Sequence, residues 1–352
     1  MPQLCPELTT KLVSLKQLKQ EFDLELSGLP QTGKTGDLAL VREAKNKLVQ
    51  GIKELQKSLW PLEYTELTFE NFEAQYEFQK NLLLNSGLLK TLTTGGLGIE
   101  AIDNKEYPIP TLEQIEEMML EKREFLKTKI PQGFVKLVLV PLGLPLDSLI
   151  KAYGDTLNEH YRQGKLLDTK NKPLELGEES IVGCARYTEA EATGDLVYFP
   201  QEYSKTTHQG KTKKQLLLIQ AWQVLLIEDL PDLPAEGRSK IKAKRQQQEA
   251  NQSPNYYLKQ LQNDPQYKGE QGLTPESWLI YALSHLTQTN QVIDNYEGSS
   301  KGCYLLSVCF KKFGYVSYVY FYRKLAQVIF DQHDPAAGSY SNVSSRSAVS
   351  IL

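Results

Sequence analysis

The sequence predicts an α+β protein, with an α-helical N-terminal region over residues 1–130 and a mixed domain over residues 131–352. Apolar residues in the first third recur at the three- and four-residue spacing of helices. The segment Lys129-Ile-Pro-Gln-Gly133 then interrupts this pattern and marks the domain boundary. Beyond it, short apolar runs and alternating segments predict strands between helices.

Composition excludes several classes of protein. The chain has 352 residues, 40% of them hydrophobic and 24% charged, which suits about two globular domains. Its net charge of -3 predicts no nucleic-acid partner, because phosphate binding needs clustered Lys and Arg. Residues Met1 to Leu26 lack the apolar core of a signal peptide, and no apolar run predicts insertion into a membrane. We therefore expect a cytoplasmic protein by default, and association with a surface or a mobile element stays open.

Helices are expected first at Leu8–Glu21, Asp37–Leu59 and Phe69–Leu84. The second of these carries a one-sided apolar stripe, formed by Leu38, Val41, Ala44, Leu48, Ile52 and Leu55. Glycines and prolines between Gly95 and Pro110 mark a break. Thr111 followed by Gln114 is a capping box, which opens a further helix through about Lys127.

The second domain begins with apolar runs that predict buried strands. These runs are Phe134–Val140, Leu196–Phe199 and Val224–Ile227. Helices are expected at Leu146–Tyr161 and, after the N-cap Thr274 with Pro275 at the first position, through about Ile293. Residues 240–253 are rich in Lys, Arg and Gln without an apolar stripe, which favours a solvated loop or an exposed helix end.

The tail reads as three strands, Tyr304–Phe310, Val316–Arg323 and Val328–His333. The last two alternate with the two-residue period of half-buried strands. Tyr318, Tyr320 and Tyr322 share one face of such a strand. Tyrosine combines a large contact area with a polar group and little rotamer entropy, so this face indicates either an aromatic core or a binding surface.

The sharpest motif match is Gly28-Leu-Pro-Gln-Thr-Gly33-Lys34-Thr35, the pattern of a phosphate-binding P-loop. Val224–Ile227 followed by Glu228 and Asp229 resembles its acidic Walker B partner. The strand before a P-loop should be apolar on both faces, whereas Phe22-Asp-Leu-Glu-Leu26 alternates acidic and apolar residues. A P-loop ATPase is therefore the alternative to the leading interpretation, and a polar turn before a helix is the simpler explanation.

Other catalytic patterns are weak. The histidines His160, His208, His285 and His333 lack metal-ligand spacing, and His285 is expected to be structural. The cysteines Cys5, Cys184, Cys303 and Cys309 suit a reducing compartment, and we expect inert thiols. On one continuous strand, Cys303 and Cys309 would lie roughly 20 Å apart, although a turn would change that. No metal, cofactor or catalytic residue is predicted.

Several tail motifs together resemble a known family. They are Gly314-Tyr-Val316, Tyr320-Phe-Tyr-Arg323, Asp334-Pro335 and Arg346-Ser-Ala-Val349. They look like the C-terminal region of variable proteins of diversity-generating retroelements. These proteins have a C-type-lectin-like fold related to the formylglycine-generating enzyme. Upstream segments resemble a family of such proteins in candidate-phyla bacteria, namely Gln132-Gly-Phe134, Leu139-Val-Pro-Leu-Gly143, Leu196-Val-Tyr-Phe-Pro-Gln201, Asn263-Asp-Pro-Gln-Tyr267 and Gly272-Leu-Thr-Pro-Glu-Ser-Trp278.

The resemblance implies a ligand-binding protein, not an enzyme, whose variable segment spans about residues 314–343. In such systems a reverse transcriptase copies a template with errors at adenines, so asparagine codons become Tyr, Ser, Asp, His, Ile, Gly or Val codons. The predicted ligand-binding positions all carry reachable residues. They are Tyr315, Tyr318, Tyr320, Tyr322, Ile329, Asp331, His333, Ser339, Tyr340 and Ser341.

The scaffold between these positions is expected to include Val316, Val328, Phe330 and Val349. Phe321, Ser344 and Ser350 depart from the family's Trp, Gly and Arg, and the glycine replaced by Ser344 would suit a tight turn. The expected partner is a protein ligand, bound without a metal. An oxidase of the formylglycine-generating type is a third reading, because that fold is shared and cysteines are present.

Overall fold

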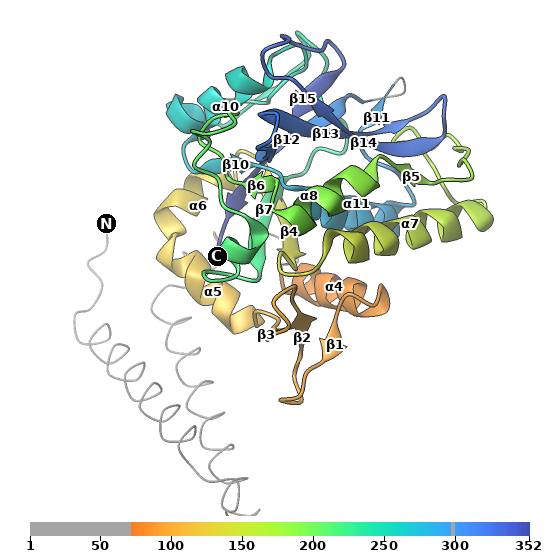
Figure 1. Cartoon of the computed structure of the whole chain (residues 1–352), viewed down its shortest axis with the longest axis vertical. Coiled ribbons are helices and arrows are strands. Elements are labelled where there is room, and N and C mark those ends of the chain that lie inside the picture. The colour runs from red at the N-terminus through yellow and green to blue at the C-terminus, as the bar shows by residue number, and fades with distance from the viewer. Residues whose placement is uncertain (1–71, 297–299) are drawn as a thin grey trace, which may run out of the picture. The chain divides into compact units, whose positions relative to one another are not determined.

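A computed structural model describes residues 72–296 and 300–352 of the chain (Figure 1). They belong to one compact unit, Glu70–Leu352, of mixed α and β structure. The predicted helices at 8–21 and 37–59, and the motif Gly28–Thr35, lie outside the described residues. None of the described helices is long and apolar enough to cross a membrane.

Residues 72–130 are part of this unit, which corrects the predicted boundary at residue 131. Its elements are α4 (Phe72–Asn85), β1 (Lys90–Thr91), β2 (Leu97–Glu100), β3 (Glu106–Pro108), α5 (Leu112–Glu121) and α6 (Arg123–Lys129). The Gln75 side chain accepts a bond from Leu137 N and donates one to Val135 O, so α4 is fastened to the strand at Phe134. The region is also not purely helical, because β1, β2 and β3 form an antiparallel sheet.

The predicted capping box is present at α5. Thr111 Oγ1 accepts from Gln114 N, and the Gln114 side chain accepts from Thr111 N. The expected single helix to Lys127 is instead two helices, α5 and α6, which divide at Lys122.

Two larger sheets build the rest of the unit. The first is antiparallel, with strand order β10-β16-β7-β4. Its strands are β4 (Phe134–Val140), β7 (Gln223–Glu228), β10 (Glu270–Gly272) and β16 (Ser347–Ser350). The strand β16 thus lies between two strands that come much earlier in the chain.

The second sheet has the order β15-β12-β13-β14-β5, with β6 paired to β12 and β11 to β13. Its strands are β5 (Ile181–Val182), β6 (Leu196–Tyr198), β11 (Asn295–Tyr296), β12 (Gly302–Phe310), β13 (Tyr315–Tyr322), β14 (Gln327–His333) and β15 (Val343–Ser345). The central strands β12, β13 and β14 are antiparallel, and they confirm the three strands predicted for the tail.

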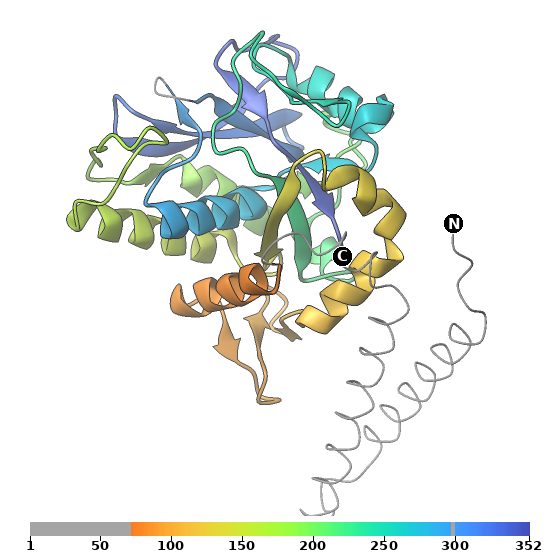
Figure 2. The ribbon, with the colours of Figure 1, turned by 180° about the vertical axis from the view of Figure 1, so that it is seen from behind.

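Helices lie on both sides of this second sheet (Figures 1 and 2). They are α7 (Leu146–Arg162), α8 (Cys184–Thr193), α9 (Lys213–Leu216), α10 (Pro254–Asn263), the 3-10 turn η1 (Pro265–Tyr267) and α11 (Pro275–Thr289). On one side, Trp278 of α11 packs edge-on against Tyr153 of α7, with ring centroids 5.8 Å apart, and against Phe330 of β14 at 5.6 Å. Trp278 therefore joins two helices to the sheet.

The predicted scaffold residues Val316, Val328, Phe330 and Val349 are all buried, which confirms that part of the assignment. Phe321, which stands where the resembled family has Trp, is buried as well.

Ser344 lies within β15 and hydrogen-bonds Gln248 O. The expectation of a tight turn at Ser344 is therefore wrong, and this position needs no glycine.

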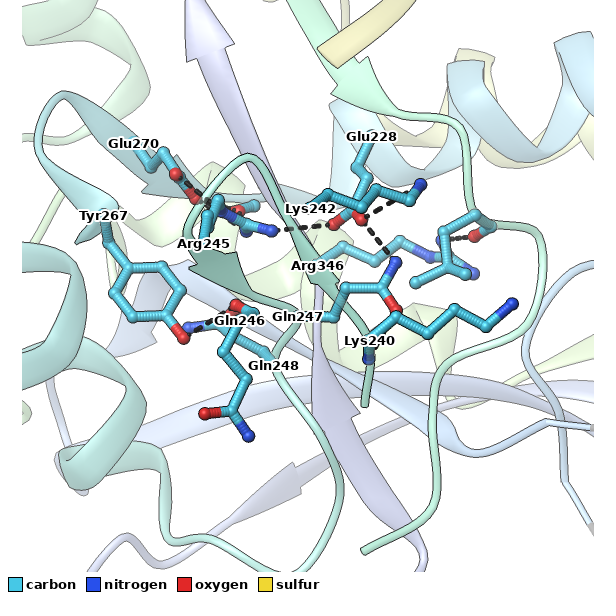
Figure 3. A network of polar contacts seen from close by, with 12 residues as sticks. Glu228, Lys240, Lys242, Arg245, Gln246, Gln247, Gln248, Tyr267, Glu270 and Arg346 are labelled. Carbon is cyan, nitrogen blue, oxygen red and sulfur yellow. Dashed lines mark hydrogen bonds and ion pairs between the residues drawn. The ribbon is translucent and has the colours of Figure 1, made fainter. Parts of the chain in front are cut away.

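The segment 240–253 is not the solvated loop that its composition predicts. It contains a hairpin of β8 (Ile241–Lys242) and β9 (Arg245–Gln246), and Arg245 is almost fully buried. Figure 3 shows its guanidinium between two carboxylates, Glu270 and Glu228. The guanidinium also lies over the ring of Phe134, 4.9 Å from its centroid. A buried charge needs such partners, and local sequence does not show them.

Candidate ligand-binding surface

The alternation of β13 divides its side chains between two environments. Val319 and Phe321 are buried against the α11 side of the sheet, whereas Tyr318, Tyr320 and Tyr322 are half-buried on the opposite face. This is the separation that the sequence pattern predicts.

Strand β14 extends the same face. Tyr318 lies opposite Asp331 and Tyr320 lies opposite Ile329 in the antiparallel register. Residues directly opposite on neighbouring strands project to the same side of a sheet. We call the surface formed by Tyr318, Tyr320, Tyr322, Ile329 and Asp331 the tyrosine face.

One end of this side of the sheet is covered. Tyr257 and Leu261 of α10 pack with Tyr304, Leu306 and Val316 in one buried cluster. Tyr318 packs against the edge of that cluster. The helix α10 therefore closes the sheet up to Tyr318 and leaves the part beyond it open.

A pocket of about 350 Å³ opens at this uncovered part. That volume falls at the lower end of the range for pockets that bind small molecules. Its lining comes from β13, β11, the start of β12, the loop before β15 and the first residue of β15, namely Tyr296, Gly302, Tyr318, Tyr320, Ser339, Tyr340, Ser341, Asn342 and Val343. We call it the tyrosine pocket.

Four tyrosine rings shape the pocket. The rings of Tyr318 and Tyr320 are nearly parallel, at 9°, with centroids 5.7 Å apart. Tyr296 meets Tyr320 at 74° and 5.2 Å, and Tyr340 meets Tyr318 at 63° and 6.1 Å. Two parallel rings are thus flanked by two steeply inclined ones.

Gly302 keeps room beside these rings. A Cβ atom at Gly302 would lie 3.3 Å from Cβ of Tyr320, closer than such atoms usually approach. The loop side is held by the amide of Asn342, which donates to the Tyr296 hydroxyl at 3.2 Å. The absence of a Cβ at Gly302 leaves room for Tyr320, and the bond from Asn342 holds the Tyr296 ring at the pocket.

The hydroxyls of Tyr318 and Tyr320 stay protonated at neutral pH. Burial raises the pKa of Tyr320 to about 12, and burial and Asp331 raise that of Tyr318 as well. The Tyr318 hydroxyl donates a hydrogen bond to Asp331 Oδ2 at 3.0 Å. The other oxygen of Asp331 accepts from Gln332 N and from Arg186, which is half-exposed.

His333 does not belong to the exposed surface, which corrects its assignment. Its parity is that of Asp331, but only 2% of the residue is exposed. The loop after β14 folds back over it, so that the Tyr340 ring centroid lies 4.1 Å away and Gly338 O lies 3.1 Å from Nε2. Alternation fixes the face on which a side chain lies, but it does not show what covers that face.

The other predicted positions divide into three groups. Tyr318, Tyr320, Ser339, Tyr340 and Ser341 line the tyrosine pocket. Tyr322, Ile329 and Asp331 lie beside it on the tyrosine face. Tyr315 is half-buried at the other end of β13, next to Phe313, and does not line the pocket.

Sequence reasoning missed four lining residues, Tyr296, Gly302, Asn342 and Val343. Tyr296 arrives through the parallel pairing of β11 with β13, a long-range contact without a local signal. Asn342 could have been found, because it lies inside the predicted variable segment and adjoins Ser341.

Glu228, the acidic partner expected for the P-loop alternative, is engaged with other side chains. Glu228 accepts bonds from Arg245 and Gln247, and its strand β7 has only antiparallel neighbours, unlike a Walker B strand in a parallel sheet.

Cys303 and Cys309 are buried, and burial raises the pKa of both thiols, that of Cys309 to about 12. Within residues 72–296 and 300–352, no group of three or more His, Cys, Asp or Glu side chains could hold a metal ion.

Comparison with known proteins adds no assignment. No protein-family model, curated protein or solved structure matches the chain. Its function is therefore inferred from its own residues and their geometry.

Proposed function

We propose that this chain is a ligand-binding protein whose C-terminal segment, about residues 314–343, is a recognition surface diversified by adenine-specific retroelement mutagenesis. In this proposal the unit is a C-type-lectin-like scaffold and the ligand is a protein. Binding requires no metal or cofactor, and the chain is not an enzyme.

One observation carries the proposal: the same short segment contributes both a fixed core and an open aromatic pocket. Val319 and Phe321 are buried, while Tyr318 and Tyr320, their neighbours in the chain, line the pocket. A surface meant to vary needs this separation, because exposed substitutions change stability little and core substitutions change it greatly. Because buried and exposed side chains alternate along the strand, the exposed residues can change while the core residues stay the same.

The chemistry of the lining supports the same proposal. Tyr340, Ser339, Ser341 and Asn342 stand in a row on the loop before β15, and each is a residue that adenine-specific mutagenesis of Asn codons reaches. Tyrosine with serine and asparagine is also the mixture that antibody binding loops use, with rigid rings for contact area and small polar groups for adaptable hydrogen bonds.

The DNA around the gene tests diversification directly. We expect a reverse-transcriptase gene and a near-identical copy of the segment that encodes residues 314–343. Differences between copy and gene should fall at adenines of the copy, in codons for Tyr318, Tyr320, Tyr340 and their neighbours. A copy whose differences were spread over all four bases, or the absence of any copy, would contradict the proposal.

Binding is tested with a library that varies Tyr318, Tyr320, Ser339, Tyr340 and Ser341 and keeps the core. Selection against a panel of purified proteins should enrich different sequences for different targets, while every enriched variant melts close to the parent. A matched library at the buried positions Val316, Val319, Phe321, Val328 and Phe330 should yield mostly unfolded chains. Equal tolerance at both sets would argue against a dedicated surface.

The P-loop ATPase remains the alternative, since the motif Gly28–Thr35 is present in the chain. ATP binding measured by fluorescence, followed by Lys34→Ala, decides between the two. Hydrolysis that Lys34→Ala abolishes would favour the ATPase.

A further inference from the structure

The charge around the tyrosine pocket carries an inference about what it binds. None of its nine lining residues is charged. Asp331 contacts the lining through its carboxylate, which accepts a hydrogen bond from the Tyr318 hydroxyl. A pocket with aromatic walls and a neighbouring carboxylate offers negative potential to a ligand.

The arrangement of the tyrosine rings favours a cation in the pocket. The faces of aromatic rings are electron-rich, and a cation within about 6 Å of a ring centroid is attracted to them. Neighbouring ring centroids in the pocket lie 5.2 to 6.1 Å apart, so a cation resting against two adjacent rings can lie within about 6 Å of both centroids. The hydrogen bond to Asp331 adds electron density to the Tyr318 ring, which strengthens its attraction for a cation.

We propose that the tyrosine pocket binds a positively charged side chain, the ammonium of a lysine or the guanidinium of an arginine, presented by the protein ligand. This rests on the proposed function, because it names the chemical group that the recognition surface takes. The inclined rings of Tyr296 and Tyr340 enclose the cation from the sides. The hydroxyls of Ser339 and Ser341 at the loop offer acceptors for its N–H groups.

Arg186 does not oppose this role. It is half-exposed, bonds Asp331 at 3.3 Å through the oxygen that Tyr318 does not use, and comes from α8, on the other side of the sheet. An exposed ion pair of this kind is weak, and it leaves the pocket side of Asp331 facing the tyrosines.

The test uses the full chain with carbon-13 in its tyrosine rings, and three probes: the N-acetyl amides of lysine, arginine and norleucine. Norleucine offers the hydrocarbon stem without the charge. We expect the lysine and arginine probes to shift the ring signals of Tyr318, Tyr320 and Tyr340 and to bind at least about five-fold more tightly than norleucine.

Variants separate the ring from the hydroxyl. Tyr320→Phe keeps a ring face and should retain binding of the charged probes, whereas Tyr320→Leu should lose it. Tyr340→Leu, at an exposed loop position, should also weaken binding of the charged probes. Tyr315→Leu is the matched control, since this half-buried tyrosine of the same strand lies outside the pocket, and it should bind like the parent.

Equal binding of norleucine and lysine would overturn the proposal and define a neutral apolar pocket. Charged probes that leave the pocket tyrosines unshifted would overturn it as well. Either result leaves the recognition surface standing, because the library and the flanking DNA test that surface independently. Conversely, charge-selective binding with no template copy in the DNA would support the cation pocket and contradict diversification.

Discussion

Tyr318 on β13 and Asp331 on β14 lie directly opposite each other, and the phenol donates a 3.0 Å hydrogen bond to the carboxylate. This bond joins a ring that lines the pocket to the neighbouring strand. Asp331 also meets Arg186 of α8. A side chain in the predicted variable segment thus connects the tyrosine face with a helix on the other side of the sheet.

The coupling between Tyr318 and Asp331 should be small but measurable. Both groups are partly exposed, so solvent competes for the bond, and we expect about 0.5–1 kcal/mol. The measurement is a double-mutant cycle of Tyr318→Phe and Asp331→Ala in urea unfolding. A coupling free energy of zero would mean that the two positions vary independently.

Truncating a side chain on each of the two faces of β14 should cost very different amounts of unfolding free energy. Phe330→Ala removes a ring packed against Trp278 and Tyr187 and should cost about 3–5 kcal/mol of unfolding free energy. Ile329→Ala, the adjacent residue on the tyrosine face, should cost about 1 kcal/mol or less. Urea unfolding of both variants beside the parent decides, and a larger loss for Ile329→Ala would reverse the assignment of the faces.

Arg245→Met should destabilise the unit by about 3–5 kcal/mol, because it leaves the buried carboxylates Glu228 and Glu270 without their shared guanidinium. Lys242→Met is the control. Its amine is 3.7 Å from Glu228 on a partly exposed side chain, so its loss should cost about 1 kcal/mol or less. Thermal and urea unfolding measure both. If Arg245→Met lost no more unfolding free energy than Lys242→Met, the network would tolerate removal of its central cation.

The stability of the unit should fall with acid through His285. Burial, and then Arg346, lower the pKa of this histidine from 6.5 to about 4. Below pH 6.5 the His285 imidazole is protonated in the unfolded chain but stays neutral in the folded chain. The stabilisation present above pH 6.5 is therefore lost as the pH falls toward 4. His285→Gln should flatten this part of the stability profile. An unchanged profile would assign the acid sensitivity to other groups.

Patterns that depend on neighbours in the chain could be predicted from the sequence. The strand Phe134–Val140 and the capping box at Thr111 match the structure, and so does the alternation of Val319 and Phe321 with the tyrosines. Each depends on local periodicity or on one side chain reaching its own backbone.

Features that depend on distant partners could not be predicted. The strands β1 to β3 are too short to show a period, and Arg245 looks solvated until Glu228 and Glu270 are placed beside it. In the same way, the loop that covers His333 and the pairing that brings Tyr296 to the pocket join parts of the chain with no shared local pattern.

The position of β16 between β10 and β7 has a consequence for synthesis of the protein. A ribosome must translate the whole of residues 314–343 before it reaches β16, and the four-stranded sheet has a gap at its centre until then. A premature stop or a frameshift introduced into that segment would therefore remove β16. The defective chain would expose the edges of β7 and β10 and become a substrate for proteases. Under the diversification proposed above, frame-breaking errors would in this way be cleared by degradation, and only chains read through in frame would display a pocket.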